Sequence, residues 1–113
     1  MSKVFTVVLS ACVFALIAVA PVRASDITVI NVTIKNHRFI PDRIEVEAGK
    51  PFTLIVKNED PTPEEFESHD FNREKIINGN SSAKIRVGAL KAGEHKFFGE
   101  FNEDTAQGVI VAK

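Results

Sequence analysis

The sequence contains very little sulfur: Cys12 is its only cysteine and Met1 its only methionine. Both lie in an N-terminal stretch that we expect to be removed, so the remaining chain cannot form an internal disulfide. A small exported domain without disulfides must be stabilised by packed apolar surface. The sequence also lacks acyl-transfer triads, phosphate-binding glycine loops and paired cysteines for zinc, which excludes these classes of site.

Clustered positive charge is also missing. The 113 residues include 14 basic and 15 acidic side chains, and the formal net charge is −1. Loss of Lys3 and Arg23 with the N-terminal stretch would change it to −3. Nucleic-acid binding, which requires a basic surface, is therefore not expected.

The N-terminal stretch has the pattern of a secretory signal peptide. A basic Lys3 precedes an apolar run from Val4 to Ala20, and small residues lie at the positions that favour cleavage after Ala24. The run is shorter than the roughly 20 residues of a spanning helix, so an uncleaved anchor is the weaker alternative. A lipoprotein box at Leu9–Cys12 is disfavoured because more apolar sequence follows Cys12. We expect residues 1–24 to be a signal peptide and residues 25–113 to form one domain.

The remaining chain alternates between short strand-like segments and turns. The expected strands are 26–35, 44–47, 51–57, 75–77, 84–87, 95–98 and 109–112. Turn residues such as Asn78-Gly79-Asn80 separate them. About seven short strands without a long helical period predict an all-β, antiparallel sandwich or barrel.

One acidic segment interrupts this pattern between residues 59 and 74. It carries seven carboxylates, one histidine (His69) and one basic residue (Arg73). In an extended Glu65-Phe66-Glu67, the two carboxylates lie on one side and Phe66 on the other, toward the core. Such a pair is half of a site for a hard cation. The alternative is a solvated loop whose charges keep an edge soluble.

Several short, separated segments of the sequence together resemble a cupredoxin, and the resemblance covers nearly all of residues 25–113. They are Asn58-Glu59-Asp60, the strand His95-Lys96-Phe97-Phe98 after Gly93, and Gly108-Val109-Ile110-Val111. The resemblance implies a Greek-key β-sandwich with a copper site between two loops. At the ligand positions this sequence has Glu64, Gly99, Asn102 or Glu103, and Ala106. A type 1 blue copper site is therefore not expected.

A second set of short segments resembles a particular branch of cupredoxin-like proteins. These are residues 65–68, 73–75, 97–101 and 105–108. The branch comprises periplasmic components of bacterial iron uptake, related to the EfeO-type cupredoxin domain and to the ferroxidase-like component that accompanies an FTR-type permease. The resemblance implies a periplasmic location, an iron or copper ion as ligand, and an inner-membrane iron permease with its periplasmic components as partners. It leaves open whether two chains form a homodimer.

The resemblance and the residue types lead to three hypotheses. The first is a metal-binding accessory protein of an iron transporter. The second adds ferroxidase-like oxidation of ferrous iron, because carboxylates stabilise ferric iron more than ferrous iron. The third is a metal-free sandwich that docks onto a permease or periplasmic partner through its acidic edge. The expected metal ligands are Glu65, Glu67 and Glu100, with Glu64, His69 and Glu103 as second choices.

Strand parity and composition supply the remaining expectations. Glu100 should face outward with Phe98 if the strand before it stays regular; the alternative is a surface ion pair with Arg73 or Lys75. His37 is expected to be solvated, and His95 to fill a core or edge position. The expected aromatic core consists of Phe39, Phe52, Phe66, Phe97 and Phe101.

Overall fold

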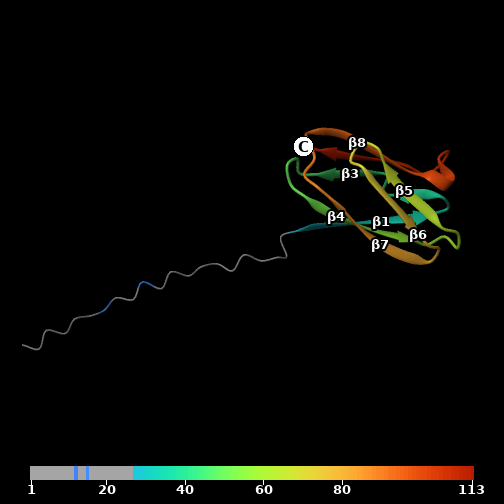
Figure 1. Ribbon diagram of the computed structural model, residues 1–113, viewed down its shortest axis with the longest axis horizontal. Coiled ribbons are helices and arrows are strands. Elements are labelled where there is room, and N and C mark those ends of the chain that lie inside the picture. Colours follow the sequence, from blue (N-terminus) through green and yellow to red (C-terminus); the bar gives the residue numbers. More distant parts are fainter. Residues whose placement is uncertain (1–11, 13–14, 16–26) are drawn as a thin grey trace, which may run out of the picture.

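The computed structural model describes residues 12, 15 and 27–113, drawn as the coloured part of Figure 1. The predicted signal peptide, residues 1–24, lies outside the described residues apart from Cys12 and Ala15. A search of the described residues finds no helix with the length and apolar character needed to cross a membrane.

Within residues 27–113, nine strands form two sheets that pack as a sandwich. Their orders are β2-β1-β4-β7 in one sheet and β3-β9-β8-β5-β6 in the other. The elements are β1 (Thr28–Lys35), β2 (Arg38–Ile40), β3 (Arg43–Val46), β4 (Phe52–Asn58), β5 (Glu64–Ser68), β6 (Arg73–Ile77), β7 (Ser81–Val87), β8 (Gly93–Gly99), the 3₁₀ turn η1 (Glu100–Asn102) and β9 (Gln107–Ala112). Figure 1 shows η1, in orange, at one end of the sandwich.

The predicted all-β sandwich is confirmed, but two details of the prediction are wrong. The sheets are mixed rather than antiparallel, because β1 pairs in parallel with β4 and β3 pairs in parallel with β9. The described part of the chain forms nine strands rather than about seven, because β2 and β5 were not predicted. The extended acidic segment is therefore partly a strand inside a sheet, with β6 and β8 as its neighbours.

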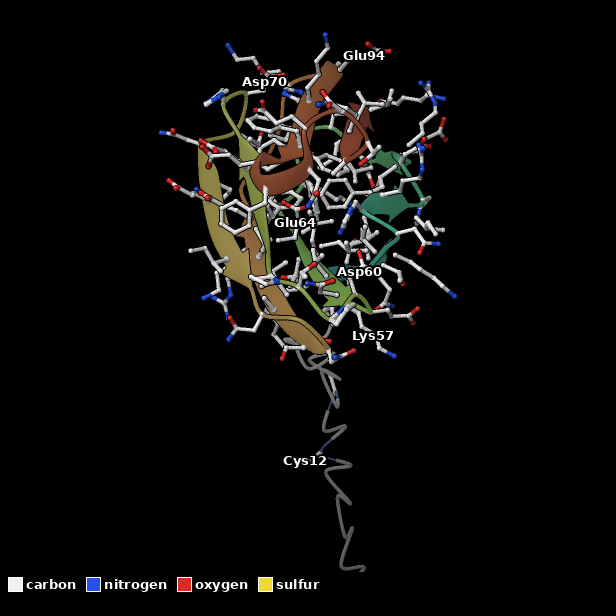
Figure 2. All side chains as sticks on the ribbon, turned by 90° about the vertical axis from the view of Figure 1, so that its right-hand side faces the viewer. Cys12, Lys57, Asp60, Glu64, Asp70 and Glu94 are labelled. Atoms are coloured by element: carbon white, nitrogen blue, oxygen red, sulfur yellow. The ribbon has the colours of Figure 1, made fainter. Side chains whose placement is uncertain are left out.

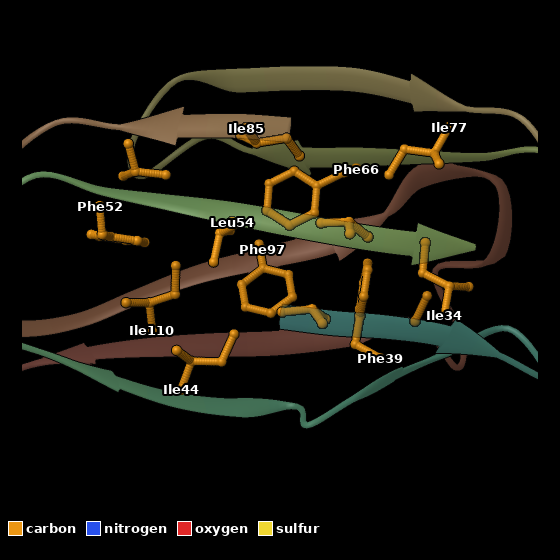
Figure 3. Packing of buried hydrophobic residues seen from close by; sticks show 14 of the residues in the cluster. Ile34, Phe39, Ile44, Phe52, Leu54, Phe66, Ile77, Ile85, Phe97 and Ile110 are labelled. Atoms are coloured by element: carbon orange, nitrogen blue, oxygen red, sulfur yellow. The ribbon is translucent and has the colours of Figure 1, made fainter. Parts of the chain in front are cut away.

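Aromatic side chains from four strands, together with aliphatic ones, fill the space between the sheets (Figure 3). The rings of Phe39 and Phe97 meet edge-on at 4.9 Å, and those of Phe66 and Phe97 stack at 5.1 Å between centroids. Phe52 is also buried. Phe101 was predicted to join this core and does not: it is 48% exposed. The chain leaves β8 at Gly99 and turns into η1, so the alternation of the strand no longer applies at position 101.

Asp60 fixes the hairpin between β1 and β2 at the end of the sandwich that also carries η1. Its buried carboxylate accepts hydrogen bonds from the backbone N–H groups of Asn36 at 2.8 Å and His37 at 2.9 Å. Both of these residues have positive φ, at 52° and 56°, a conformation that costs non-glycine residues free energy. The carboxylate offsets that cost by satisfying two backbone donors. His37 is exposed, as expected for a solvated turn residue.

Replacing Asp60 by alanine is expected to lower the free energy of unfolding by about 2–3 kcal/mol, because two hydrogen bonds to a charged acceptor are lost. Urea denaturation measures the change. The adjacent Glu59→Ala is the matched control: Glu59 pairs with exposed Lys57 at 3.6 Å, a contact worth about 1 kcal/mol or less. Equal effects of the two substitutions would contradict this account of the hairpin.

Candidate metal centre

Four glutamates gather on the outer face of the five-stranded sheet. Glu65, Glu67, Glu74 and Glu100 each offer a carboxylate oxygen, and these four oxygens all lie within 4.8 Å of one another. Glu65 is buried, Glu67 is half-buried, and Glu74 and Glu100 are exposed. The group is thus open to solvent on one side and enclosed on the other.

The register of the strands explains why residues distant in sequence meet here. Glu65 and Glu67 are two residues apart on β5 and share a face. In the β5–β6 hairpin Glu67 lies opposite Glu74. In the β5–β8 pair Phe66 lies opposite Gly99, so the next residue along the chain, Glu100, comes beside Glu65. Phe66 between the two glutamates is fully buried in the core.

Glu65 is the most unusual member of the group. Glu65 is only 6% exposed, and its buried Oε1 atom has no hydrogen-bond partner. A proton shared with the Glu74 and Glu100 carboxylates, together with desolvation and their negative charges, raises the pKa of Glu65 to about 8. A buried carboxylate oxygen without a donor is costly for the fold and indicates a ligand that the oxygen could bind.

Among the described residues, no lysine or arginine side chain lies close enough to balance the negative charge of these four carboxylates. The pKa of Glu67 is raised, chiefly by a proton shared with Glu100, with burial and the charges of Glu100 and Glu74 adding to the effect. His69 is the one basic side chain within 4.0 Å of a cluster carboxylate in this part of the chain: its Nδ1 lies 3.9 Å from Glu67 Oε1. Its ring is 76% exposed and packs on Phe98 at 5.3 Å. The group therefore lacks a fixed protein counter-charge.

The structure brings together only part of the predicted ligand set. Glu65, Glu67 and Glu100 lie in the cluster, and His69 lies at its edge. Glu64 faces the interior and Glu103 is exposed beside a surface hollow of about 420 Å³ next to Glu100, so neither belongs to the group of four. The alternative pairing of Glu100 with Arg73 or Lys75 is not found within residues 27–113; the Arg73 guanidinium instead donates to the backbone carbonyls of Asn72 and Arg86.

Glu74 is the member that the sequence analysis missed. It was counted among the acids of the segment, but the expected strand began one residue later, at Lys75. The signal that could have found it is the β5–β6 hairpin, in which parity places position 74 opposite position 67. Recognising that hairpin requires reading Glu64–Ser68 as a strand.

A second group of residues converges inside the sandwich end, at the positions that the cupredoxin resemblance aligns with copper ligands. The Glu64 carboxylate, 1% exposed as a residue, accepts a hydrogen bond from Asn102 Nδ2 at 2.6 Å. Gly99 and Ala106 lie against it, since a Cβ added at Gly99 would come within 2.7 Å of both Glu64 Cδ and Ala106 Cβ. Figure 2 looks onto this end of the sandwich and shows Glu64 beside the η1 segment. The carboxylate fills the space between these positions.

Comparison with known proteins assigns the family. Residues 6–112 match the cupredoxin-like domain family, so the chain belongs to it. An uncharacterized protein of Rickettsia prowazekii is 45% identical over 86 residues, which cover 76% of this chain and 69% of that protein.

Solved structures with the same fold include copper proteins. The metal-binding domain of the Streptococcus pneumoniae Cu(I)-exporting P-type ATPase CopA superimposes with a TM-score of 0.71 at 16% identity, covering 80% of this chain and 90% of that one. Auracyanin A, a blue copper protein from Chloroflexus aurantiacus, gives 0.67 at 16% identity, covering 76% and 98%. At these identities the likeness establishes the fold alone.

Proposed function

We propose that this protein is a periplasmic metal-binding accessory of an iron-transport system, and that it binds iron through Glu65, Glu67, Glu74 and Glu100. The observation that carries the proposal is the buried, unpartnered Oε1 of Glu65 within a group of four carboxylates. Carboxylate repulsion makes such a group unfavourable unless protons or a cation occupy it. A bound cation would bind the unpartnered oxygen and offset much of the negative charge of the cluster.

The donor set favours a hard cation. Oxygen-only ligands suit iron, manganese, calcium or magnesium better than they suit Cu(I). Among these ions, iron is supported by the resemblance of residues 65–68, 73–75 and 97–101 to iron-uptake components. His69, which lies 3.9 Å from Glu67, adds a nitrogen donor at the edge that increases affinity for a transition metal.

The copper centre of the fold family does not fit the residues of this chain. A type 1 site requires a thiolate, imidazoles and a weak axial ligand, and the corresponding positions carry Glu64, Gly99, Asn102 and Ala106. A side chain at position 99 would also collide with the Glu64 carboxylate. We therefore place the metal site beside the family's copper position, on the outer face of the sheet.

Two features of the site bear on what happens to the bound ion, namely its transfer to a partner and its oxidation. Glu74 and Glu100 are exposed, so one side of the site remains accessible to a partner such as an inner-membrane permease. Carboxylate ligands also stabilise ferric over ferrous iron and so favour oxidation, with dioxygen as the electron acceptor. A rate of ferrous loss in air above that of buffer alone would identify a ferroxidase; an equal rate would leave a carrier.

Manganese(II) is the probe that locates the site, because it substitutes for ferrous iron and its unpaired electrons broaden nearby NMR signals. Titrating the metal-free protein is expected to broaden the backbone amides of residues 65–67, 74 and 98–100 first. The exposed acids Glu103 and Asp104 provide an internal comparison. Broadening that begins at these acids, or that is uniform over the surface, would reject the site and favour the alternative of a metal-free docking module.

A further inference from the structure

Glu64 is the immediate neighbour of Glu65 but points in the opposite direction, into the sandwich. Its Oε1 accepts hydrogen bonds from the backbone N–H groups of Glu65 at 3.0 Å and Phe101 at 2.9 Å. Its Oε2 accepts from Asn102 Nδ2 at 2.6 Å. Both oxygens of this buried carboxylate are therefore partnered, in contrast to the Oε1 atom of Glu65. A buried carboxylate with partners on both oxygens is well accommodated in the fold.

These bonds act on the segment that carries Glu100. Phe101 and Asn102 follow Glu100 in η1, and both are tied to Glu64 on β5. On the other side of Glu100, Gly99 pairs with Phe66 of β5, and its N–H donates to the Ala106 carbonyl at 2.9 Å. Residues on both sides of Glu100 are thus attached to β5, the strand that also carries Glu65 and Glu67.

Such a hold is needed wherever no shared proton links Glu100 to the cluster, because the carboxylate charges then repel the segment. Glu65, Glu67 and Glu74 all present carboxylates toward Glu100, and within the described residues no lysine or arginine lies within 4.0 Å of the group. Like charges at this separation favour an outward movement of η1, which has no buried residue of its own to resist it. The hydrogen bonds from η1 to Glu64 oppose that movement.

We propose that Glu64 is a positioning residue of the metal site: by binding Phe101 N–H and the Asn102 side chain, it keeps Glu100 against Glu65 and Glu67. The inference rests on the proposed function for its effect on metal binding. The contact of Glu64 with η1 can be tested without metal. Two adjacent glutamates of one strand then divide the work, the inward one holding a loop and the outward one binding the ion.

The test compares Glu64→Met, which keeps the length of the side chain and removes both acceptors, with a reciprocal exchange, Glu64→Gln with Asn102→Asp. In the exchange, the new amide at position 64 donates to the new carboxylate at position 102, and the amide oxygen still accepts from Phe101 N–H, while the net charge is unchanged. Manganese(II) affinity, measured well below the melting temperature, is expected to fall about 10–100-fold in Glu64→Met. We expect the reciprocal double variant to restore it to within about threefold of wild type.

A double-mutant cycle separates positioning from mere stability. Glu100→Gln is expected to weaken binding in the wild-type background and to have little further effect in Glu64→Met, because Glu100 is already displaced there. If Glu64→Met lowers only the melting temperature, leaving the affinity and the effect of Glu100→Gln intact, Glu64 is structural and the inference is wrong.

Amide hydrogen exchange of Phe101 in metal-free protein supplies the independent readout. If the Phe101 amide is protected in wild type and in the Glu64→Gln, Asn102→Asp variant but not in Glu64→Met, then Glu64 holds η1 in place. This result would stand even if wild type binds no metal, and in that case only the proposed function fails. Unchanged protection in Glu64→Met would overturn the inference.

Discussion

The double variant Glu65→Gln, Glu67→Gln is expected to bind manganese(II) and ferrous iron at least about 100-fold more weakly than wild type. Substitutions of residues that only support metal ligands change affinity by about 10–100-fold, and these two residues are proposed as ligands themselves. Glutamine keeps the size of each side chain but removes its charge. Isothermal titration calorimetry under anaerobic conditions measures the loss.

The control for this variant must change the charge of the protein equally at another place. Glu47→Gln, Glu94→Gln does so, because these exposed residues pair with Lys50 and Arg43, and neither belongs to the cluster. The control is expected to bind metal like wild type. Similar weakening in both double variants would show that the ion responds to the overall negative charge and that the cluster is not a site.

The sequence was sufficient to predict the class of fold because period-two alternation is clear in the long strands. In β4, Phe52, Leu54 and Val56 are all buried while the residues between them are not fully buried. Pairing between distant strands cannot be obtained in this way. The parallel pairs β1–β4 and β3–β9 join segments that no single turn connects, and alternation is the same for parallel and antiparallel neighbours.

Strand β5 was overlooked because its inward face is mostly polar. Glu64, Phe66 and Ser68 all point into the sandwich and are buried, yet only one of them is apolar. A pattern that marks buried positions by hydrophobicity cannot find such a strand. Ser68 satisfies its hydroxyl group by donating to the Lys96 carbonyl at 2.7 Å, and Glu64 binds η1. These two partners lie 28 and 38 residues away in sequence.

Part of the candidate site could nevertheless be anticipated from local parity. An extended Glu65-Phe66-Glu67 must place its two carboxylates on one face if Phe66 enters the core, and the structure has this arrangement. The outward direction of Glu100 was expected from the regularity of the strand before it. Glu74 and the inward orientation of Glu64 depend on the registers β5–β6 and β5–β8, which residue types alone do not define.

The metal-free protein is expected to lose stability as the pH rises from about 4.5 to about 8. The cause is Glu65, whose pKa is raised from 4.5 to about 8 by the proton it shares with Glu74 and Glu100. In the unfolded chain this carboxyl group is ionised above about pH 4.5. Between the two values the folded protein binds more protons than the unfolded chain, so the free energy of unfolding decreases with pH. Above about pH 8 both states are ionised and this contribution is constant. The raised pKa of Glu67 acts in the same direction.

Thermal unfolding in the presence of a chelator, at pH values from about 5 to about 9, measures this decrease. Glu65→Gln is expected to flatten the curve and to melt at a higher temperature than wild type near pH 8, because it removes the charge that the fold accommodates poorly. Manganese(II) is expected to raise the melting temperature of wild type near pH 8 and to leave that of Glu65→Gln almost unchanged.

The control for the pH dependence is Glu45→Gln. Lys113 lowers the pKa of Glu45 through a hydrogen bond and its charge, so this residue adds stability that is lost only below about pH 4.5. Its removal is expected to leave the slope between about pH 5 and about pH 8 intact. If the stability of wild type instead rises over this range, or if Glu65→Gln melts below wild type near pH 8, then the carboxylates stabilise the fold without a metal. The cluster would then be a structural feature, because an empty binding site for a cation must become less favourable as its protons leave.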